Sequence, residues 1–178
     1  MNPRVWTFDL EANQPSGKII QIGGCIGRID TGEMIEEFNW YINPGEPISP
    51  YITELTGITQ ATIDVNGVSV NTAVAALEPL LQNRSCMRMP VVWGAGDLSA
   101  LQKEITVPSS LKELHRTLDI KVIHQMRMLA QSKSIRGGLA KALEINGLTF
   151  EGSEHNAVAD AINTFRLAHV YYKVLKQG

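Results

Sequence analysis

Thr7-Phe8-Asp9-Leu10-Glu11 is the stretch that decides the fold, since it sets two acidic residues at the end of a short apolar run. In an extended strand alternate side chains share a face, so Asp9 and Glu11 point the same way and their apolar neighbours face another layer. Two like charges about 6–7 Å apart on a buried strand repel each other. The pattern therefore predicts a cationic partner, unless Glu11 already belongs to the polar loop that follows and is solvated.

The length and composition of the chain indicate a globular protein. At 178 residues it fits one domain, which we expect to span residues 1–178. Hydrophobic residues make up 44% and charged residues 19%, which excludes a disordered or fibrous class. No apolar run approaches the ~20 residues that span a bilayer, and the first residues lack a signal peptide's apolar core, so we expect a cytoplasmic protein. The spacing of Cys25 and Cys86 fits neither a metal site nor a redox motif, so both are expected to be reduced thiols.

Acidic and basic residues are concentrated in different parts of the chain. The net charge of −2 argues against binding nucleic acid by bulk electrostatics, but the distribution of charge matters more than its sum. Residues 1–64 carry nine acidic and three basic residues, whereas residues 112–141 carry seven basic and two acidic ones. An acidic centre with one basic region is typical of a protein that holds divalent metals and contacts a phosphate backbone. A solvated helix face is the alternative for the basic region.

Periodicity predicts strands that alternate with helices, the pattern of an α/β domain. Besides the first strand, alternating apolar residues predict an antiparallel hairpin over 18–42, a short buried strand at 91–93 and an edge strand at 118–120. Helical spacing is found over 69–83, 98–105, 121–132, 139–145 and, most clearly, 158–175. Gly57 is expected to end a short helix that begins near Pro50, and Thr59 to cap another short turn.

Three further residues are candidates for a site. Asp97 follows the short strand at 91–93, with an N-cap as the simplest alternative role. Asp160 lies beside the apolar stripe of the last helix, among alanines that would let this helix approach a sheet closely, with a surface salt bridge as the alternative. His155 cannot share a helix face with Asp160, because five residues at about 100° each leave them about 140° apart. It therefore belongs in the loop or first turn, where it either swings over a site or lies on the surface.

These residues occur in three ordered segments: Phe8-Asp9-Leu10-Glu11, Trp93-Gly94-Ala95-Gly96-Asp97 and His155-Asn156-Ala157-Val158-Ala159-Asp160-Ala161. In this order, at predicted strand ends and a helix start, they resemble the three motifs of the DEDDh 3′–5′ exonucleases of the DnaQ-like, ribonuclease H-like superfamily. Residues 54–59 are similar to the segment between the first two motifs. Residues 138–152 look most like the Eri-type branch, whose members often act on RNA.

The resemblance implies a ribonuclease H-like α/β fold, with a mixed five-stranded sheet flanked by helices. It also implies a metal-dependent 3′–5′ exonuclease that releases nucleoside 5′-monophosphates from the 3′ end of single-stranded DNA or RNA. Four carboxylates would hold two divalent ions: Asp9, Glu11, Asp97 and Asp160. Mg²⁺ and Mn²⁺ prefer oxygen ligands, and two such ions about 3.5–4 Å apart suit phosphodiester hydrolysis.

Other roles carried over by the resemblance concern the base and the substrate. His155 would act as general base on the attacking water. The hydrophobic pocket for the last nucleotide would include Leu10, Ala12 and Leu55, for which ordinary core packing is the alternative. The chain departs from many family members at Asn13, where threonine is common, and at Gly96, where an aromatic residue is common. Neither departure removes a metal ligand.

Two other functions stay open at this point. In a ribonuclease H-type endonuclease, the second acidic residue lies on a helix rather than two residues along the same strand. A non-catalytic nucleic-acid-binding or scaffold module with this fold would be expected to have lost an acidic residue or the histidine, and all five are present. Several relatives dimerise, so a homodimer is also an open alternative.

Overall fold

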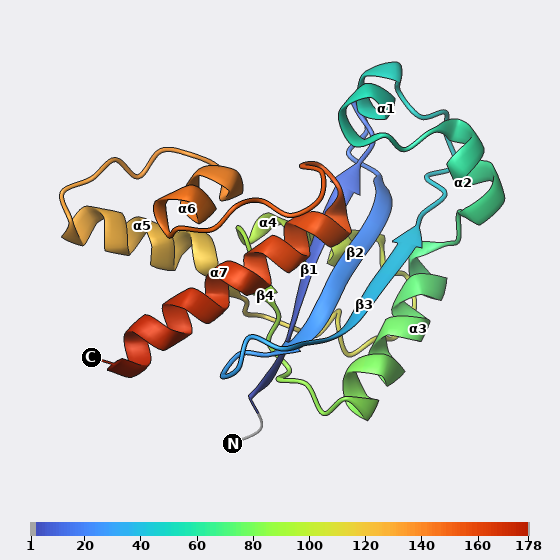
Figure 1. Ribbon diagram of the computed structural model, residues 1–178. Helices are drawn as coiled ribbons and strands as arrows, with labels where there is room; N and C mark the ends of the chain where they lie inside the picture. Colours follow the sequence, from blue (N-terminus) through green and yellow to red (C-terminus); the bar gives the residue numbers. More distant parts are fainter. Residues whose placement is uncertain (1–2, 178) are drawn as a thin grey trace.

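The structure, a computed structural model, describes residues 3–177 and has a five-stranded sheet at its centre (Figure 1). The strands are β1 (Arg4–Ala12), β2 (Ile19–Arg28), β3 (Met34–Tyr41), β4 (Val91–Val92) and β5 (Leu118–Asp119). Their order is β3-β2-β1-β4-β5. The pairs β1–β2 and β2–β3 are antiparallel, whereas β1–β4 and β4–β5 are parallel. The predicted mixed sheet, hairpin and edge strand are therefore confirmed.

Seven helices are found in the described part of the chain: α1 (Pro50–Thr56), α2 (Gln60–Asn66), α3 (Val70–Asn83), α4 (Gly96–Glu104), α5 (Ile120–Ala130), α6 (Leu139–Ile145) and α7 (Ala157–Gln177). Gly57 ends α1 with a φ of 74°, and the Thr59 side chain caps α2, both as predicted. Within residues 3–177, none of the helices is long and apolar enough to cross a membrane.

The sheet separates two apolar layers, and β1 contributes alternate side chains to each. Trp6 and Phe8 pack into one layer with residues of α3 and α4. Val5 packs into the other layer with Phe165 of α7 and residues of α6. Figure 1 shows α7 crossing one face of the sheet while α3 lies beyond the other. By the same alternation Asp9 and Glu11 belong to the α7 face, as the strand pattern predicts.

The start of α7 lies directly on β2, because Gly23 has no side chain. A Cβ atom at Gly23 would lie 2.4 Å from the backbone nitrogen of Val158 and 2.6 Å from the backbone carbon of Ala157. Gly23 is also the residue of β2 that pairs with Asp9. The predicted close approach of the last helix to the sheet is thus found beside Asp9.

Candidate functional site

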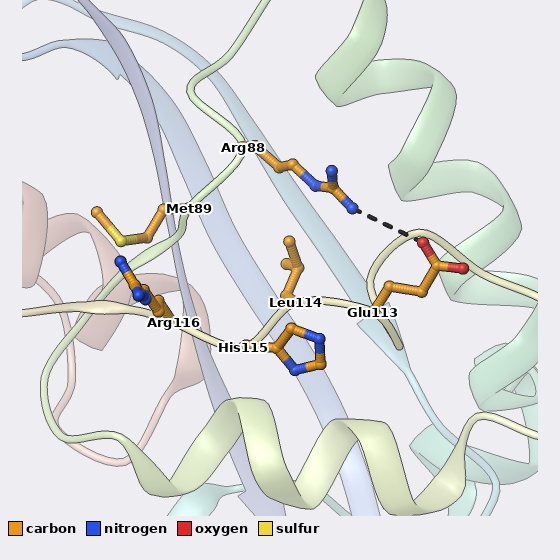
Figure 2. A pocket seen from close by; sticks show the side chains of 6 residues that line it. All are labelled: Arg88, Met89, Glu113, Leu114, His115 and Arg116. Carbon is orange, nitrogen blue, oxygen red and sulfur yellow. Dashed lines mark ion pairs between the residues drawn. The ribbon is translucent and has the colours of Figure 1, made fainter.

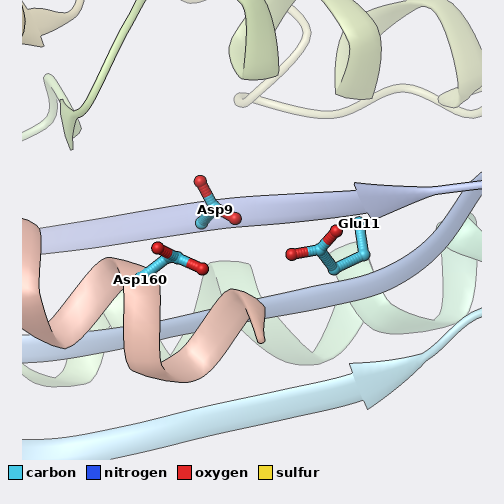
Figure 3. A group of neighbouring side chains, drawn as sticks. All are labelled: Asp9, Glu11 and Asp160. Carbon is cyan, nitrogen blue, oxygen red and sulfur yellow. The ribbon is translucent and has the colours of Figure 1, made fainter. Parts of the chain in front are cut away.

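Three carboxylates converge at one point between β1 and α7 (Figure 3). Asp9 and Glu11 come from β1, and Asp160 comes from the first turns of α7. Each offers an oxygen, and these oxygens all lie within 4.8 Å of one another. Glu11 is part of the strand and only 9% exposed, so its alternative placement in a solvated loop is wrong. The loop begins later because β1 continues its pairing with β2 as far as Ala12.

Asp97 is not one of the three carboxylates within 4.8 Å of one another, but its negative charge acts on two of them. Its charge raises the pKa of both Asp9 and Glu11, so it lies near enough to act on them. The alternative role as an N-cap is wrong, because α4 begins at Gly96 and its N-cap is Ala95, without a side-chain hydrogen bond. Asp97 therefore lies within the first turn of α4, where its carboxylate does not cap the helix.

Burial and mutual repulsion oppose ionisation of these four side chains. Burial is the largest cause that raises the pKa of Glu11 and of Asp97, each to about 7. Burial and the three neighbouring carboxylates raise the pKa of Asp9 well above its ordinary value. Burial also raises the pKa of Asp160, although the nearby charge of His155 acts in the opposite direction. Among residues 3–177, none of the ion pairs includes any of the four. Carboxylates crowded together without an ion-pair partner fit divalent ions that prefer oxygen ligands.

His155 lies in the turn just before α7, so its predicted position is confirmed. It is exposed and has a φ of 61°, which places its backbone in the left-handed region. The backbone N–H groups of His155 and Asn156 donate hydrogen bonds to the carboxylate of Asp160. The side-chain oxygen of Asn156 accepts the N–H of Ala159 at 3.2 Å, as an N-cap does. The turn that carries the imidazole is thus tied to one of the clustered acids.

The three residues predicted to bind the last base do not share one apolar cluster. Leu10 is half-buried and packs against the layer that contains Phe8. Leu55 is half-buried as well, but packs against a separate cluster around Ile52. Ala12 ends β1 and is also half-buried. Each of the three is partly exposed, and their role in binding the last base stays a prediction.

Two residues that organise the site did not stand out in the sequence. Gln21 of β2 is fully buried opposite Glu11, and its side-chain oxygen accepts the N–H of Ala157 at 3.1 Å. It therefore ties the start of α7 to the sheet. The available signal was one polar residue within the apolar run of β2. Asp119, at the end of β5, accepts the N–H of Gly94 at 3.1 Å and, after burial, is the main cause that raises the pKa of Asp97.

Asn13, one of the departures from the family pattern, has a structural role beside β1. Its side-chain nitrogen donates to the carboxylate of Glu46 at 2.8 Å, and its side-chain oxygen accepts the N–H of Ser49 at 2.9 Å. Because Ser49 caps α1, Asn13 joins the end of β1 to the helix that carries Leu55. Gly96, the other departure, has open space where its Cβ would be.

Figure 2 shows a separate pocket, which none of the four acidic residues lines. Its lining residues precede β4 and β5: Arg88, Met89, Glu113, Leu114, His115 and Arg116. An ion pair of 3.7 Å joins Arg88 to Glu113 across it. β4 and β5 run parallel to β1. The pocket therefore lies at the amino-terminal ends of these strands, whereas Glu11 lies near the carboxyl-terminal end of β1. We therefore do not include it in the candidate site.

Comparison with known proteins agrees with this geometry. Residues 7–168 match the RNase_T family model, described as exonuclease. The chain is 29% identical to the 3′-5′ exonuclease Snipper of Drosophila melanogaster, over 97% of this chain and 66% of Snipper. It is 27% identical to ERI1 exoribonuclease 2 of Danio rerio, over 89% of this chain and 32% of that protein. The chain thus spans just under two thirds of the first relative and about a third of the second.

A solved structure has the same fold. The nuclease domain of 3′hExo, a DEDDh family member bound to rAMP, superimposes with a TM-score of 0.76 at 19% identity, covering 99% of this chain and 94% of that one. The predicted ribonuclease H-like fold and the resemblance to DEDDh exonucleases are confirmed. The chain belongs to the RNase_T exonuclease family.

Proposed function

We propose that residues 1–178 form one metal-dependent 3′–5′ exonuclease domain that releases nucleoside 5′-monophosphates from the 3′ end of a single-stranded nucleic acid. The observation that carries this proposal is the convergence of Asp9, Glu11 and Asp160, whose oxygens lie within 4.8 Å of one another. These side chains come from elements separated by most of the sequence. Membership of an exonuclease family supports the same reaction.

The four acidic residues would supply the oxygen ligands for Mg²⁺ or Mn²⁺. Divalent ions, when bound, supply an activated water and neutralise charge on the leaving 3′-oxygen. The chain's own contribution is a set of half-buried or buried carboxylates held by β1, α4 and α7, three packed elements that keep the ligands in fixed relative positions. Preorganised ligands of this kind reduce the ordering that must occur when an ion binds.

His155 would take the proton of the attacking water. Histidine is the commonest general base in enzymes. The exposed position of its side chain, on a turn hydrogen-bonded to Asp160, supports this role, because the imidazole can reach solvent and the cluster from one place. In the released product the 5′-phosphate stays on the mononucleotide, and the remaining strand keeps a 3′-hydroxyl.

The half-buried side chains of Leu10, Ala12 and Leu55 would contact the last base and its sugar. Their separate packing means that the base would lie between two apolar clusters rather than inside one. One relative is named an exoribonuclease, and a structural neighbour is bound to rAMP. These names support testing RNA first, with DNA beside it.

Cys25 and Cys86 are free thiols, which supports a reducing compartment such as the cytoplasm. A homodimer is a prediction that sedimentation of the purified chain would check.

The decisive experiment is a degradation assay on matched single-stranded RNA, single-stranded DNA and duplexes labelled at the 5′ end. We expect stepwise shortening from the 3′ end and release of mononucleotides with Mg²⁺ or Mn²⁺, and no reaction with chelator. Asp9→Ala and Asp160→Ala should each reduce the rate by more than about 100-fold, the upper range for residues that only support a metal ligand.

Glu113→Gln is the matched control, because this carboxylate lines the pocket at the amino-terminal ends of β4 and β5. It should degrade the substrates at the wild-type rate. Normal degradation by Asp9→Ala or Asp160→Ala would contradict the proposed reaction. Internal cleavage of a circular single strand would instead indicate an endonuclease, and binding without cleavage would indicate a scaffold module.

A further inference from the structure

Asp119 makes one hydrogen bond more than an ordinary helix cap. It is the last residue of β5 and the N-cap of α5. Its Oδ1 accepts the N–H of Lys121 at 2.9 Å and that of Val122 at 3.4 Å. The same oxygen accepts the N–H of Gly94 at 3.1 Å. This third hydrogen bond leaves the helix and reaches the loop between β4 and α4.

The loop that donates this hydrogen bond has few other polar contacts. Gly94 has a φ of 99°, a backbone conformation that residues with side chains rarely adopt. The N-cap of α4, Ala95, makes no side-chain hydrogen bond. Within the part of the chain that the structure describes, the bond from Gly94 to Asp119 is the one side-chain hydrogen bond to residues 93–97. Asp97 lies three residues after Gly94, in the first turn of α4.

We propose that Asp119 is a positioning residue for Asp97. By holding the N–H of Gly94 it fixes the start of α4, and so determines where the Asp97 carboxylate lies relative to Asp9 and Asp160. This inference rests on the proposed function, because it assumes that the four acids bind divalent ions. Oδ1 of Asp119 acts through the backbone, because it accepts three N–H groups.

Three substitutions separate this role from others. Asp119→Asn keeps an oxygen that accepts N–H groups but removes the negative charge. Asp119→Ser can still cap α5, since serine is a common N-cap, but its shorter side chain loses the reach to Gly94. Asp119→Ala removes both. Ser69→Ala is the matched control, because Ser69 caps α3 through the N–H of Thr72 and has no hydrogen bond to the loop before Asp97.

The test measures Mn²⁺ binding to the full chain by isothermal titration, without nucleic acid. We expect Asp119→Ser and Asp119→Ala to weaken the affinity for at least one Mn²⁺ by about 10–100-fold, the range found for groups that orient metal ligands. Asp119→Asn should bind within about threefold of the wild type, and Ser69→Ala should bind like it. In degradation assays, the first two variants should need correspondingly more Mn²⁺ for half-maximal rate and recover at saturating Mn²⁺.

Circular dichroism checks that each variant is folded. If Asp119→Ala does not fold, the Mn²⁺ affinity of Asp119→Ser tests the inference. Wild-type Mn²⁺ affinity in Asp119→Ser would overturn the inference. So would an Asp119→Asn variant as weak as Asp119→Ala, which would mean that Asp119 acts through its charge, or a Ser69→Ala variant that is equally weak. The two proposals can also fail separately. If the wild type binds Mn²⁺ more tightly than Asp119→Ser but degrades no nucleic acid, the proposed function is contradicted and this inference stands.

Discussion

His155 differs from the four acids because its side chain is exposed and its backbone has a positive φ. Asparagine tolerates that backbone conformation and cannot act as a general base, so His155→Asn is the sharpest substitution. We expect turnover to fall by roughly 10²–10⁴-fold, the usual contribution of general acid–base catalysis. Mn²⁺ affinity should stay close to that of the wild type. Single-turnover degradation at saturating Mn²⁺ measures the first quantity, and isothermal titration measures the second.

His115→Asn is the control for this prediction, because His115 is also exposed but lines the pocket at the amino-terminal ends of β4 and β5. It should leave both quantities unchanged. A His155→Asn variant that loses Mn²⁺ affinity yet keeps the wild-type rate at saturating Mn²⁺ would mean that His155 supports metal binding instead.

The placement of single residues could be predicted from the sequence where the geometry is local. The alternation of a strand places Asp9 and Glu11 on one face, and the angle between helical residues separates His155 from Asp160. Prediction failed where a residue's partner is distant in the chain. Asp119 bonds to a residue 25 positions away and Gln21 to one 136 positions away, so neither partner could be inferred from neighbouring residues. Asp97 was open to an N-cap interpretation because no capping residue marks the start of α4.

The packing of α7 on β2 decides whether Asp160 reaches Asp9, and Gly23 controls that packing. A methyl group at Gly23 would meet backbone atoms of α7 at 2.4 and 2.6 Å, which cannot move aside as a flexible side chain would. We expect Gly23→Ala to lower the free energy of unfolding by about 1–3 kcal/mol, the usual cost of overpacking. Mn²⁺ affinity and degradation rate should each fall by at least about tenfold, since Asp160 moves away from Asp9.

Gly138→Ala is the matched control, because a Cβ at Gly138 meets nothing within 4 Å and its φ is −86°. Urea unfolding and the degradation assay should give wild-type values for it. If Gly23→Ala kept the stability and activity of the wild type, the close packing of α7 on β2 would not be needed to bring Asp160 to Asp9.

The elements themselves were predicted well where their ends carry signals. Gly57 ends α1 and Thr59 caps α2, and both boundaries agree with the sequence. The helices α4 and α5 begin two residues and one residue before the predicted starts at 98 and 121. For α5 the cause is the cap by Asp119, which recruits Ile120 into the helix rather than into the edge strand. For α4, Gly96 is a weak helix former, so propensity gave no reason to begin there.

Taken together, the fold gathers four half-buried or buried acidic side chains from β1, α4 and α7, and none of them has an ion-pair partner among residues 3–177. This arrangement makes the stability of the metal-free chain depend on pH. The pKa of Glu11 rises from an ordinary 4.5 to about 7, and that of Asp97 from 3.8 to about 7. Between those values the folded chain binds more protons than the unfolded chain, so the free energy of unfolding falls as pH rises.

We therefore expect the metal-free chain to lose stability as pH rises from about 4 through about 7. One pKa unit corresponds to about 1.4 kcal/mol, so these shifts set an upper bound of several kcal/mol, which screening by water at the half-buried side chains reduces. Mn²⁺ should restore stability at pH 8, where the carboxylates are ionised, and have little effect at pH 5, where protons occupy them. Urea unfolding at several pH values, with chelator and with Mn²⁺, measures both effects.

The control is the double variant Glu11→Gln, Asp97→Asn, which keeps the shape of both side chains and removes their charge. Its stability should vary less than that of the wild type between pH 5 and pH 8, and Mn²⁺ should not stabilise it. The difference between the two chains isolates these carboxylates from histidines that titrate in the same range. If metal-free wild type became more stable from pH 5 to pH 8, or if the double variant showed the same slope, burial and repulsion would not be opposing ionisation of these acids. The site would then have no electrostatic reason to bind divalent ions.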